Sequence, residues 1–380
     1  MKIGFDAKRA FLNTSGLGNY SRSVVESLCK YFPQHEYLLF TPRISDLFLP
    51  DKSECNATVA TPQGIWKTFH SVWRSSKIIS DLKKHKIELY HGLSNELPFG
   101  IKKSGIKSVV TIHDLIFLRH PEFYSAADRN IYHRKSKRAC AEADHIIAVS
   151  EQTKEDIMRF FGTAEEKISV IYQAIQPIFF EEKRSDELIK AQKKFDLSGK
   201  FILYVGTIEE RKNLLALLKA CQLIPANEEI DLFVVGKTTA YQKKVSEFLL
   251  RNWKNHGITF LTSVSTEDLL MLYQCATMLV YPSKFEGFGL PIAEALASGI
   301  PVIANDEKIF HEAGGRYSEY VDVNDAQKFS AAILNVLRND DRRTQMIAEG
   351  RIHASKFHPQ NQAGALAALY ELVQDAGFKT

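Results

Sequence analysis

The stretch "LVYPSKFEGFGLPIAEALASGIPVIA", residues 279–304, contains a complete strand–loop–helix–strand unit. The apolar runs at its two ends predict strands. Between them, Pro291 is well tolerated in the first turn of a helix that begins at Leu290, and Gly299 is typical of the residue that ends one. The same alternation of apolar runs and amphipathic segments fills the chain, which predicts an α/β fold of parallel sheets covered by helices on both faces.

The alternation is interrupted once, which predicts a domain boundary. The strand-like runs are "KIGF", "YLLF", "SVVTIH", "HIIAVS", "KISVIY", "FILYVG", "DLFVVG", "TMLVYPS" and "IPVIA". Residues 173–199 are polar, contain Pro177 and separate two blocks of these runs. A chain of 380 residues favours two domains. We therefore expect the boundary near residue 175, and we expect the apolar stripe of segment 361–376 to pack against one of the domains.

The composition is that of an ordinary globular protein, with 45% hydrophobic and 25% charged residues. No apolar run approaches the roughly 20 residues of a membrane span, and the N-terminus resembles a first strand rather than a signal peptide, so we expect a cytoplasmic protein. The five cysteines are odd in number and lack C-x-x-C spacing. This pattern argues against a disulfide framework and a zinc site, and favours buried or idle thiols.

The charge is distributed unevenly. Residues 1–150 contain 22 Lys and Arg against 14 Asp and Glu, whereas the whole chain carries a net charge of only +4. This surplus indicates an anionic partner for the first half, either a membrane surface or a phosphorylated substrate. A merely solvated basic face is the alternative.

The loop at 284–289 combines features of an anion site with two carboxylates. Gly287 and Gly289 allow the backbone to approach a ligand, and the following helix N-terminus favours a phosphate. Glu286 and Glu294, on either side, would repel a phosphate but would accept hydrogen bonds from hydroxyl groups. A sugar nucleotide, with phosphates between two hydroxylated rings, fits this pattern. The alternative is a surface glutamate and a helix glutamate paired with a lysine.

A second anion site is indicated in "YVGTIEERKNLLALLKA", residues 204–220. A strand ends at Gly206, and Arg211 and Lys212 lie where the next helix begins. Cations are unfavourable at a helix N-terminus unless an anion lies between them. Arg offers a bidentate fork and Lys a point charge, which suits a diphosphate. Two solvated cations are the alternative.

The first half offers weaker candidates. Gly16 and Gly18, in a loop between the first strand and the first helix, resemble a glycine-rich phosphate loop without the full dinucleotide fingerprint. His113 and Asp114 end a strand, where the imidazole could donate to a phosphate or a sugar hydroxyl. A structural role for His113 is the alternative.

Segment 64–86 interleaves basic residues with apolar ones that share a face at helical spacing, namely Trp66, Phe69, Val72 and Trp73. A basic amphipathic helix can lie on an anionic membrane. The alternative is core packing of the aromatic residues under a solvated basic face. No nucleic-acid motif accompanies the segment, so we expect no nucleic-acid partner.

Several of these segments together resemble the retaining glycosyltransferases of family 4, which have the GT-B fold. "SKFEGFGLPIAEALASGIPVIA" resembles their E-x7-E signature, and "VGTIEERKNL" resembles their diphosphate-binding segment. "GLGNYSRSVVESL", "ADHIIAVSEQTKEDI" and "STEDLLMLYQCATMLVYPS" resemble further parts of the family. The sequence departs from the family at "ANDEKIFHEAGG", residues 304–315, where charged residues replace the usual serines.

The resemblance implies two Rossmann-like doubly wound domains facing a cleft. The first spans 1–175 and recognises the acceptor; the C-terminal helix, about 358–380, crosses back to it. The second spans 176–357 and binds the donor. The resemblance also implies that Glu286 contacts the transferred sugar and Glu294 the ribose. Arg211 and Lys212 would hold the diphosphate, and His113 would face the sugar. The other donor-binding positions it implies are Gly16, Gly18, Gly206, Val264, Gly287, Phe288, Gly289 and Leu290.

The expected reaction is transfer of a sugar from a nucleoside diphosphate to a hydroxyl of a glycan or lipid-linked acceptor, without a metal or other cofactor. The Arg-Lys-Asn version of the diphosphate segment resembles that of mannosyltransferases of bacterial polysaccharide assembly, and this resemblance implies mannose from GDP-mannose as the donor. Alternatives are a UDP-sugar donor, a GT-B epimerase or phosphorylase, and a sugar-nucleotide-binding protein without catalysis. We expect a cytoplasmic location, peripheral at the inner face of the membrane if the basic first domain contacts lipid.

Overall fold

The computed structural model of the protein describes residues 1–50, 56–253 and 256–376. The chain forms two compact units. The first contains residues 1–174 and 359–380, and the second contains residues 175–358. Both limits lie one residue from those expected from the sequence.

The first unit contains a sheet of seven strands in the order β3-β2-β1-β4-β5-β6-β7, with all neighbouring strands parallel. The strands are β1 (Lys2–Asp6), β2 (Glu36–Phe40), β3 (Ala57–Ala60), β4 (Leu89–Gly92), β5 (Lys107–Ile112), β6 (His145–Ala148) and β7 (Ile168–Val170). Successive residues of β2 pack into two different cores, Tyr37 and Leu39 into one and Leu38 and Phe40 into the other. Both faces of this sheet are therefore buried, as the continuous apolar character of its strands predicts.

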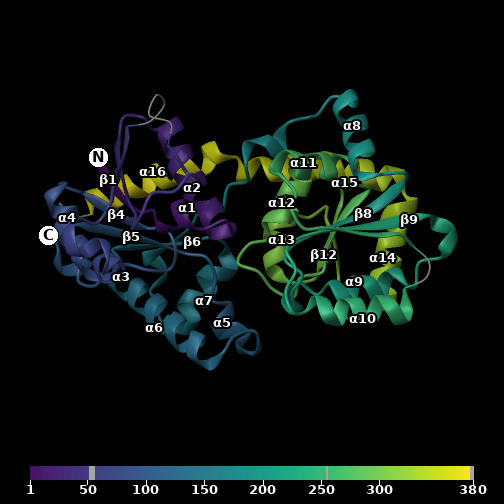
Figure 1. The fold of residues 1–380 in the computed structure, drawn as a ribbon, viewed down its shortest axis with the longest axis horizontal. Helices are drawn as coiled ribbons and strands as arrows, with labels where there is room; N and C mark the ends of the chain where they lie inside the picture. The colour runs from purple at the N-terminus through teal and green to yellow at the C-terminus, as the bar shows by residue number, and fades with distance from the viewer. Residues whose placement is uncertain (51–55, 254–255, 377–380) are drawn as a thin grey trace. The chain divides into compact units, whose positions relative to one another are not determined.

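Helices cover both faces of this sheet (Figure 1). They are α1 (Lys8–Leu12), α2 (Gly16–Tyr31), α3 (His70–Val72), α4 (Ile78–Lys84), α5 (Ile116–Arg119), α6 (Ala126–Glu142), α7 (Glu151–Phe161) and α16 (Pro359–Asp375). Residues of α2 and α16 share one core with β1 and β2, and residues of α4, α6 and α7 belong to the core on the other face. Ser125 and Ser150 begin α6 and α7 with the side-chain caps that serine favours.

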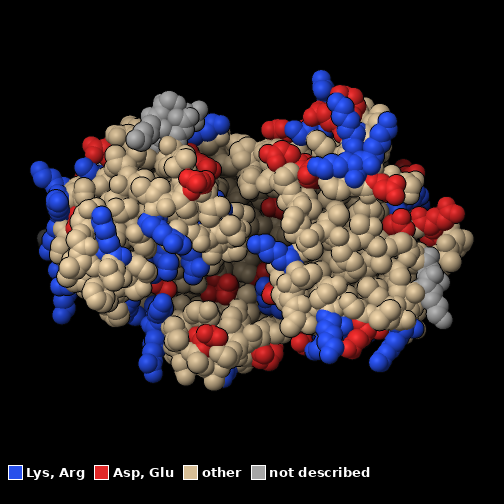
Figure 2. All heavy atoms as spheres, viewed as in Figure 1, with Lys and Arg blue, Asp and Glu red and all other residues tan. Residues whose placement is uncertain are grey.

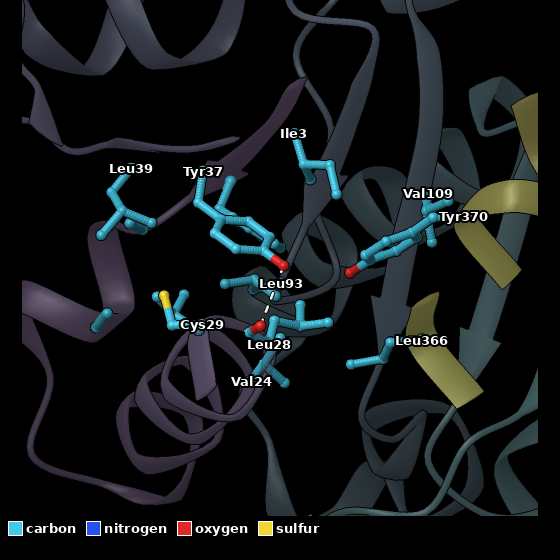
Figure 3. Close-up of a cluster of buried hydrophobic side chains, with 14 of the residues drawn as sticks. Ile3, Val24, Leu28, Cys29, Tyr37, Leu39, Leu93, Val109, Leu366 and Tyr370 are labelled. Atoms are coloured by element: carbon cyan, nitrogen blue, oxygen red, sulfur yellow. Dashed lines mark hydrogen bonds between the residues drawn. The ribbon is translucent and has the colours of Figure 1, made fainter. Parts of the chain in front are cut away.

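The C-terminal helix α16 is an integral part of the first unit. Its apolar residues Leu366 and Tyr370 enter the core shown in Figure 3, where they lie with Val24 and Leu28 of α2. The hydroxyl of Tyr370 lies 2.7 Å from Nδ1 of the buried His91, on β4. The expectation that the last helix packs against the first domain is confirmed.

The second unit contains a six-stranded parallel sheet in the order β10-β9-β8-β11-β12-β13. The strands are β8 (Lys200–Val205), β9 (Ile230–Val235), β10 (Ile258–Leu261), β11 (Met278–Tyr281), β12 (Val302–Asn305) and β13 (Glu319–Val321). The helices are α8 (Ser185–Phe195), α9 (Leu214–Cys221), α10 (Gln242–Asn252), α11 (Thr266–Cys275), α12 (Leu290–Ala297), α13 (Lys308–Gly314), α14 (Ala326–Arg338) and α15 (Asp340–Ala354). Parallel strands present their carboxyl ends, where ligands bind in open α/β sheets, at one edge.

Two expectations from the sequence were wrong. Segment 64–86 is not one amphipathic helix, because it divides into a 3₁₀ turn, the short α3, a π turn (Trp73–Lys77) and α4. Of its four expected core residues only Trp73 is buried; Phe69 and Val72 are exposed. Among the cysteines, Cys140, Cys221 and Cys275 are free thiols, but Cys29 is disulfide-bonded. Cys55 lies outside the described residues.

Among the helices of the described ranges, none combines the length and the apolar character that crossing a membrane requires.

Candidate active site

Two loops at the carboxyl ends of the neighbouring strands β8 and β11 form the candidate site. After β11, the chain runs through residues 282–289 into α12, and Gly289 before that helix has a φ of 107°, which glycine adopts without strain. After β8, a 3₁₀ turn (Glu210–Lys212) leads into α9. The amide of Lys284 donates to the carbonyl of Arg211 at 2.8 Å and fastens the two loops together.

The carboxylate of Glu286 lies between two cations of the other loop. Its Oε2 is 2.7 Å from Nη1 of Arg211, and its Oε1 is 2.5 Å from Nζ of Lys212. Only 12% of the Glu286 side chain is exposed. The segments 204–220 and 279–304 therefore contribute to one ionic cluster. Their separation along the chain does not indicate this pairing.

Two hydroxyl groups complete the surroundings of this carboxylate. Ser283 donates to Oε1 of Glu286 at 2.6 Å, and Tyr281 donates to the same oxygen at 3.2 Å. Tyr281 also accepts from Nζ of Lys212 at 2.8 Å. Burial alone would raise the pKa of Glu286, but the charges of Lys212 and Arg211 outweigh it and lower the pKa to about 2. Glu286 is therefore ionised throughout the physiological range.

The guanidinium of Arg211 is held on two further sides. Its Nη2 donates to Oε1 of Glu209 at 2.7 Å, and its Nη1 donates to the carbonyl of Phe285 at 2.7 Å. Burial opposes the charge of Arg211, but Glu286 and then Glu209 raise its pKa well above the usual value. Two carboxylates and two cations make the cluster neutral as a whole.

Glu294 lies in a different environment, one turn into α12. Its carboxyl group accepts a hydrogen bond from Tyr273 of α11 at 3.1 Å. Burial raises the pKa of Glu294 to about 7, against a smaller lowering by the Tyr273 hydrogen bond. The two glutamates of the motif therefore differ in charge at neutral pH: Glu286 is fixed as an anion, whereas Glu294 titrates there.

The other positions of the second unit named from the sequence follow strands of the same sheet, at the edge where the strands end. Gly287, Phe288, Gly289 and Leu290 form the entry to α12, with the buried Phe288 ring packed on Phe357 at a centroid distance of 5.0 Å. Gly206 follows β8, and a side chain there would meet the aliphatic part of Lys212 at 3.5 Å. Val264 lies in the loop between β10 and α11, half-buried, at the same edge of the sheet.

Three predicted site residues belong to the first unit and not to this cluster. Gly16 and Gly18 lie in the first turn of α2 rather than in a free loop, and a Cβ on Gly18 would come within 1.9 Å of the carbonyl oxygen of Asn13. His113 follows β5 and is buried. Its Nε2 donates to the carbonyl of Leu93 at 2.8 Å, and its Nδ1 lies 3.0 Å from the amide nitrogen of Gln173.

These contacts hold the ring of His113 in a fixed orientation within the first unit. Burial lowers the pKa of His113 to about 4, so the imidazole is neutral. Its ring packs edge-on against Tyr20 at a centroid distance of 4.6 Å. Donation from the ring to a sugar would require one of its two internal hydrogen bonds to break.

Sequence reasoning missed four polar residues of the candidate site: Glu209, Tyr281 and Ser283 in the ionic cluster, and Tyr273 beside Glu294. Tyr281 and Ser283 stand two residues apart where β11 ends, so an alternation of polar side chains at a strand end was the available signal. For Glu209 and Tyr273 the sequence offered no such signal. Within the described ranges, no group of His, Cys, Asp or Glu side chains is arranged to hold a metal ion.

Comparison with known proteins identifies the family. Residues 14–177 match the family model "Glycosyltransferase Family 4", and residues 185–353 match "Glycosyl transferases group 1". The chain is 31% identical to O-antigen chain mannosyltransferase B of Escherichia coli, over 98% of this chain and 100% of that protein. It is 30% identical to O-antigen chain mannosyltransferase RfbU of Salmonella typhimurium, over 60% of each chain.

Solved structures show the same fold. Anabaena HepE in complex with UDP superposes with a TM-score of 0.75, at 15% identity, over 98% of this chain and 100% of that chain. Sucrose-phosphate synthase from Thermosynechococcus elongatus gives a TM-score of 0.75, at 20% identity, over 99% and 100%. Two Rossmann-like parallel-sheet units with these neighbours are the GT-B architecture. The chain therefore belongs to glycosyltransferase family 4 and is a glycosyltransferase.

Proposed function

We propose that this enzyme transfers a mannosyl group from GDP-mannose to a hydroxyl of a glycan acceptor during surface polysaccharide assembly, with retention of the anomeric configuration. The observation that carries the proposal is the cluster of Glu286 with Arg211 and Lys212 at the entry to α12. The relatives that are named O-antigen mannosyltransferases support mannose as the transferred sugar.

In the proposed donor complex, the diphosphate takes over the two cations. Arg211 and Lys212 would turn from Glu286 to the phosphate oxygens, and the released carboxylate would accept hydrogen bonds from hydroxyl groups of the transferred sugar. The exchange keeps every buried charge paired, which avoids the cost of an isolated ion in the protein. Glu294, one turn further along α12, would accept from the ribose hydroxyls.

The chemical step then follows from the charge that develops on the leaving group. The bond between the anomeric carbon and the phosphate oxygen breaks, and the acceptor oxygen bonds to that carbon from the same face. The departing phosphate oxygen takes the acceptor proton. Arg211 and Lys212 stabilise the diphosphate as its charge grows, and such preorganised groups usually provide the largest contribution to catalysis. Because these cations supply positive charge at the phosphates, we propose that no divalent metal is required, so turnover should persist in EDTA.

Donor identity is tested by a thermal-shift panel of GDP, UDP, ADP and their sugars, because a ligand stabilises a protein by RT ln(1 + [L]/Kd). GDP and GDP-mannose should give the largest shifts. A larger shift with UDP and a UDP-sugar would show that the donor is a UDP-sugar. The assignment of the protein as a glycosyltransferase would not change.

Incubation with donor alone separates the remaining alternatives. Slow release of GDP and free mannose indicates transfer to water, as expected of a glycosyltransferase without its acceptor. A changed sugar on an intact nucleotide would indicate an epimerase, and an unchanged donor that binds tightly would indicate a protein without catalysis. Proton NMR of the glycosidic product tests the stereochemistry, and an inverted anomeric centre would contradict the front-face mechanism.

A further inference from the structure

The carboxylate of Glu286 has two uncharged partners that the proposed exchange with the diphosphate does not remove. Figure 2 shows Lys, Arg, Asp and Glu side chains spread over the surface, where water solvates them, whereas only 12% of the Glu286 side chain is exposed. A buried carboxylate that loses its cations takes up a proton unless hydrogen bonds stabilise its charge. The hydroxyl groups of Ser283 and Tyr281 are the donors that remain beside it.

The hydroxyl proton of Tyr281 is directed to Glu286. The Tyr281 oxygen accepts from Nζ of Lys212 at 2.8 Å, so its single proton is left for Oε1 of Glu286 at 3.2 Å. Burial, and then the charge of Glu286, raise the pKa of Tyr281 well above its usual value, so this hydroxyl stays protonated. The Tyr281 ring is buried and packs edge-on against Phe310 at a centroid distance of 5.6 Å, which fixes the position of the hydroxyl.

The hydroxyl proton of Ser283 is directed to the same carboxylate oxygen. The hydroxyl lies 2.6 Å from Oε1 of Glu286, whereas the carbonyl oxygens of Arg211 and Phe285 are 3.4 and 3.5 Å away. Ser283 is fully buried, and its own carbonyl accepts from the side-chain amide of Asn305, at the end of β12, at 3.2 Å. The neighbouring strands β11 and β12 therefore hold this hydroxyl in place.

The two oxygens of the Glu286 carboxylate are not equivalent. Oε1 receives both hydroxyls and Lys212, whereas Arg211 is the one partner of Oε2 among the described residues. When Arg211 and Lys212 turn to a diphosphate, Oε1 keeps two hydrogen bonds and Oε2 loses the one it has. Oε2 is then free to accept from hydroxyl groups of the transferred sugar.

Glu294 shows how a buried carboxyl group of the same unit behaves with fewer donors. Its side-chain partner within the described ranges is the hydroxyl of Tyr273 at 3.1 Å, and burial raises its pKa to about 7. Glu286 without its cations and without one of its hydroxyls would have the same set of donors. We therefore expect it to be about half protonated at pH 7 in that state. The second hydroxyl is what separates Glu286 from this condition.

We propose that Ser283 and Tyr281 are positioning residues of the transfer reaction, which keep Glu286 ionised and its Oε2 available to the sugar after the diphosphate has taken both cations. The proposal rests on the proposed function, because it requires the exchange of partners described there. It explains why two hydroxyl groups contact one oxygen of a carboxylate that already has two cations. In the ligand-free cluster these hydrogen bonds add to two ion pairs, and in the donor complex they are the contacts that remain.

Proton uptake on nucleotide binding tests the proposal without turnover. Calorimetric titration at pH 7 with GDP, or with UDP if it gives the larger thermal shift, counts the bound protons when repeated in buffers of different ionisation enthalpy. Ser283→Ala and Tyr281→Phe should each take up about half a proton more per nucleotide than the wild type, because Glu286 starts ionised and becomes about half protonated. Protons exchanged at the nucleotide phosphate and at Glu294 are common to all the proteins and cancel. Adding Glu286→Gln to either variant should abolish the extra uptake.

The pH dependence of turnover is the second measurement. At saturating donor, kcat of Ser283→Ala should be about tenfold lower at pH 6 than at pH 8.5, as expected when a required anion titrates near neutrality, and the wild type should fall by a smaller factor. Ser283→Thr keeps the hydroxyl and should restore the wild-type profile. The matched controls Ser330→Ala and Tyr320→Phe each remove one hydroxyl of the second unit from outside the ionic cluster, and should change neither measurement.

The opposite results separate this role from a merely structural one. Turnover that falls by the same factor at every pH, with unchanged proton uptake, would overturn the proposal. Extra proton uptake that persists after Glu286→Gln is added would assign the proton to another group and would also overturn it. Extra uptake that depends on Glu286, in a protein that transfers no sugar from any nucleotide, would support the role of Ser283 and Tyr281 in holding the carboxylate and would count against the proposed function.

Discussion

Replacement of Glu286 by glutamine tests both the stability of the ionic cluster and its binding of the donor. The change removes the negative charge of a side chain that is only 12% exposed, and it leaves Arg211 and Lys212 facing one another without the anion between them. Breaking a buried pair by removing one partner costs about 3–5 kcal/mol. The lowered pKa gives a similar magnitude, because a shift from 4.5 to about 2 corresponds to roughly 3 kcal/mol.

The assay is thermal unfolding of the variant with and without GDP. A loss of roughly 3 kcal/mol in a unit of this size should lower its melting temperature by roughly 6–12 °C. GDP should restore most of this loss, since its diphosphate supplies the missing anion. Turnover should fall strongly while the affinity for GDP is kept or increased, because the wild-type carboxylate competes with the diphosphate for the two cations.

The control is Glu210→Gln, in the same turn as Arg211. Glu210 forms only an exposed pair with Lys244 at 3.5 Å, and such pairs are worth about 0–1 kcal/mol. An unchanged melting temperature of Glu286→Gln would refute the buried ion-pair cluster. Loss of GDP affinity in parallel with turnover would refute the proposed exchange of partners.

Wild-type stability should also depend on pH through the same group. The folded pKa of Glu286 is depressed, so its contribution is complete above pH 4.5 and is lost as the pH falls toward 2. Acid unfolding of Glu286→Gln should lack this part of the pH dependence, which denaturant titrations between pH 5 and pH 3 would show.

Three other perturbations have defined outcomes. Burial raises the pKa of Glu294 to about 7, and the ribose hydroxyls of GDP would bind the ionised form of this carboxyl group. The affinity for GDP should therefore rise about tenfold from pH 6 to pH 8. Calorimetry of Glu294→Gln should show a smaller rise. Gly18→Ala forces a Cβ to 1.9 Å from a backbone oxygen and should lower stability by about 1–3 kcal/mol in urea titrations, whereas Gly16→Ala, with open space, should not. Tyr370→Phe leaves the buried Nδ1 of His91 without its 2.7 Å partner and should cost about 1–3 kcal/mol in the same titration.

Each of these outcomes has a clear opposite. If GDP binding depends on pH identically in wild type and Glu294→Gln, the titrating group is the phosphate of GDP and not Glu294. Equal stabilities of Gly18→Ala and Gly16→Ala would contradict the close approach in α2. An unchanged urea midpoint for Tyr370→Phe would mean that the hydrogen bond between Tyr370 and His91 does not stabilise the fold.

The sequence predicted the strands that are buried on both faces, because they form continuous apolar runs. It did not reveal β3, β4, β10 and β13. Three of these are edge strands of three or four residues, which form because a neighbouring strand pairs with them. The fourth, β4 ("LYHG"), is fully buried but contains His91, whose two ring nitrogens find partners only in the folded core.

The candidate site was predictable where residue type and position were unusual. Arg211 and Lys212 were predicted as site residues because cations are unusual at a helix start. Glu286 was predicted because it stands beside a glycine-rich loop. The direct pairing of these residues was not predictable, since it depends on the adjacency of β8 and β11 in the sheet. Segment 64–86 shows the opposite case. Its apolar residues recur at helical spacing, but the segment divides into short turns and helices in which Phe69 and Val72 are exposed.

The central claim is that the loops after β8 and β11 together bind a diphosphate. Titration calorimetry of GDP against guanosine, in wild type, Lys212→Ala and the exposed control Lys243→Ala, tests it most directly. GDP should bind the wild type and Lys243→Ala far more tightly than guanosine, and Lys212→Ala should lose about 10–150-fold of the GDP affinity, the value of one charged hydrogen bond. Equal GDP affinity in all three proteins, or equal binding of GDP and guanosine, would contradict the claim.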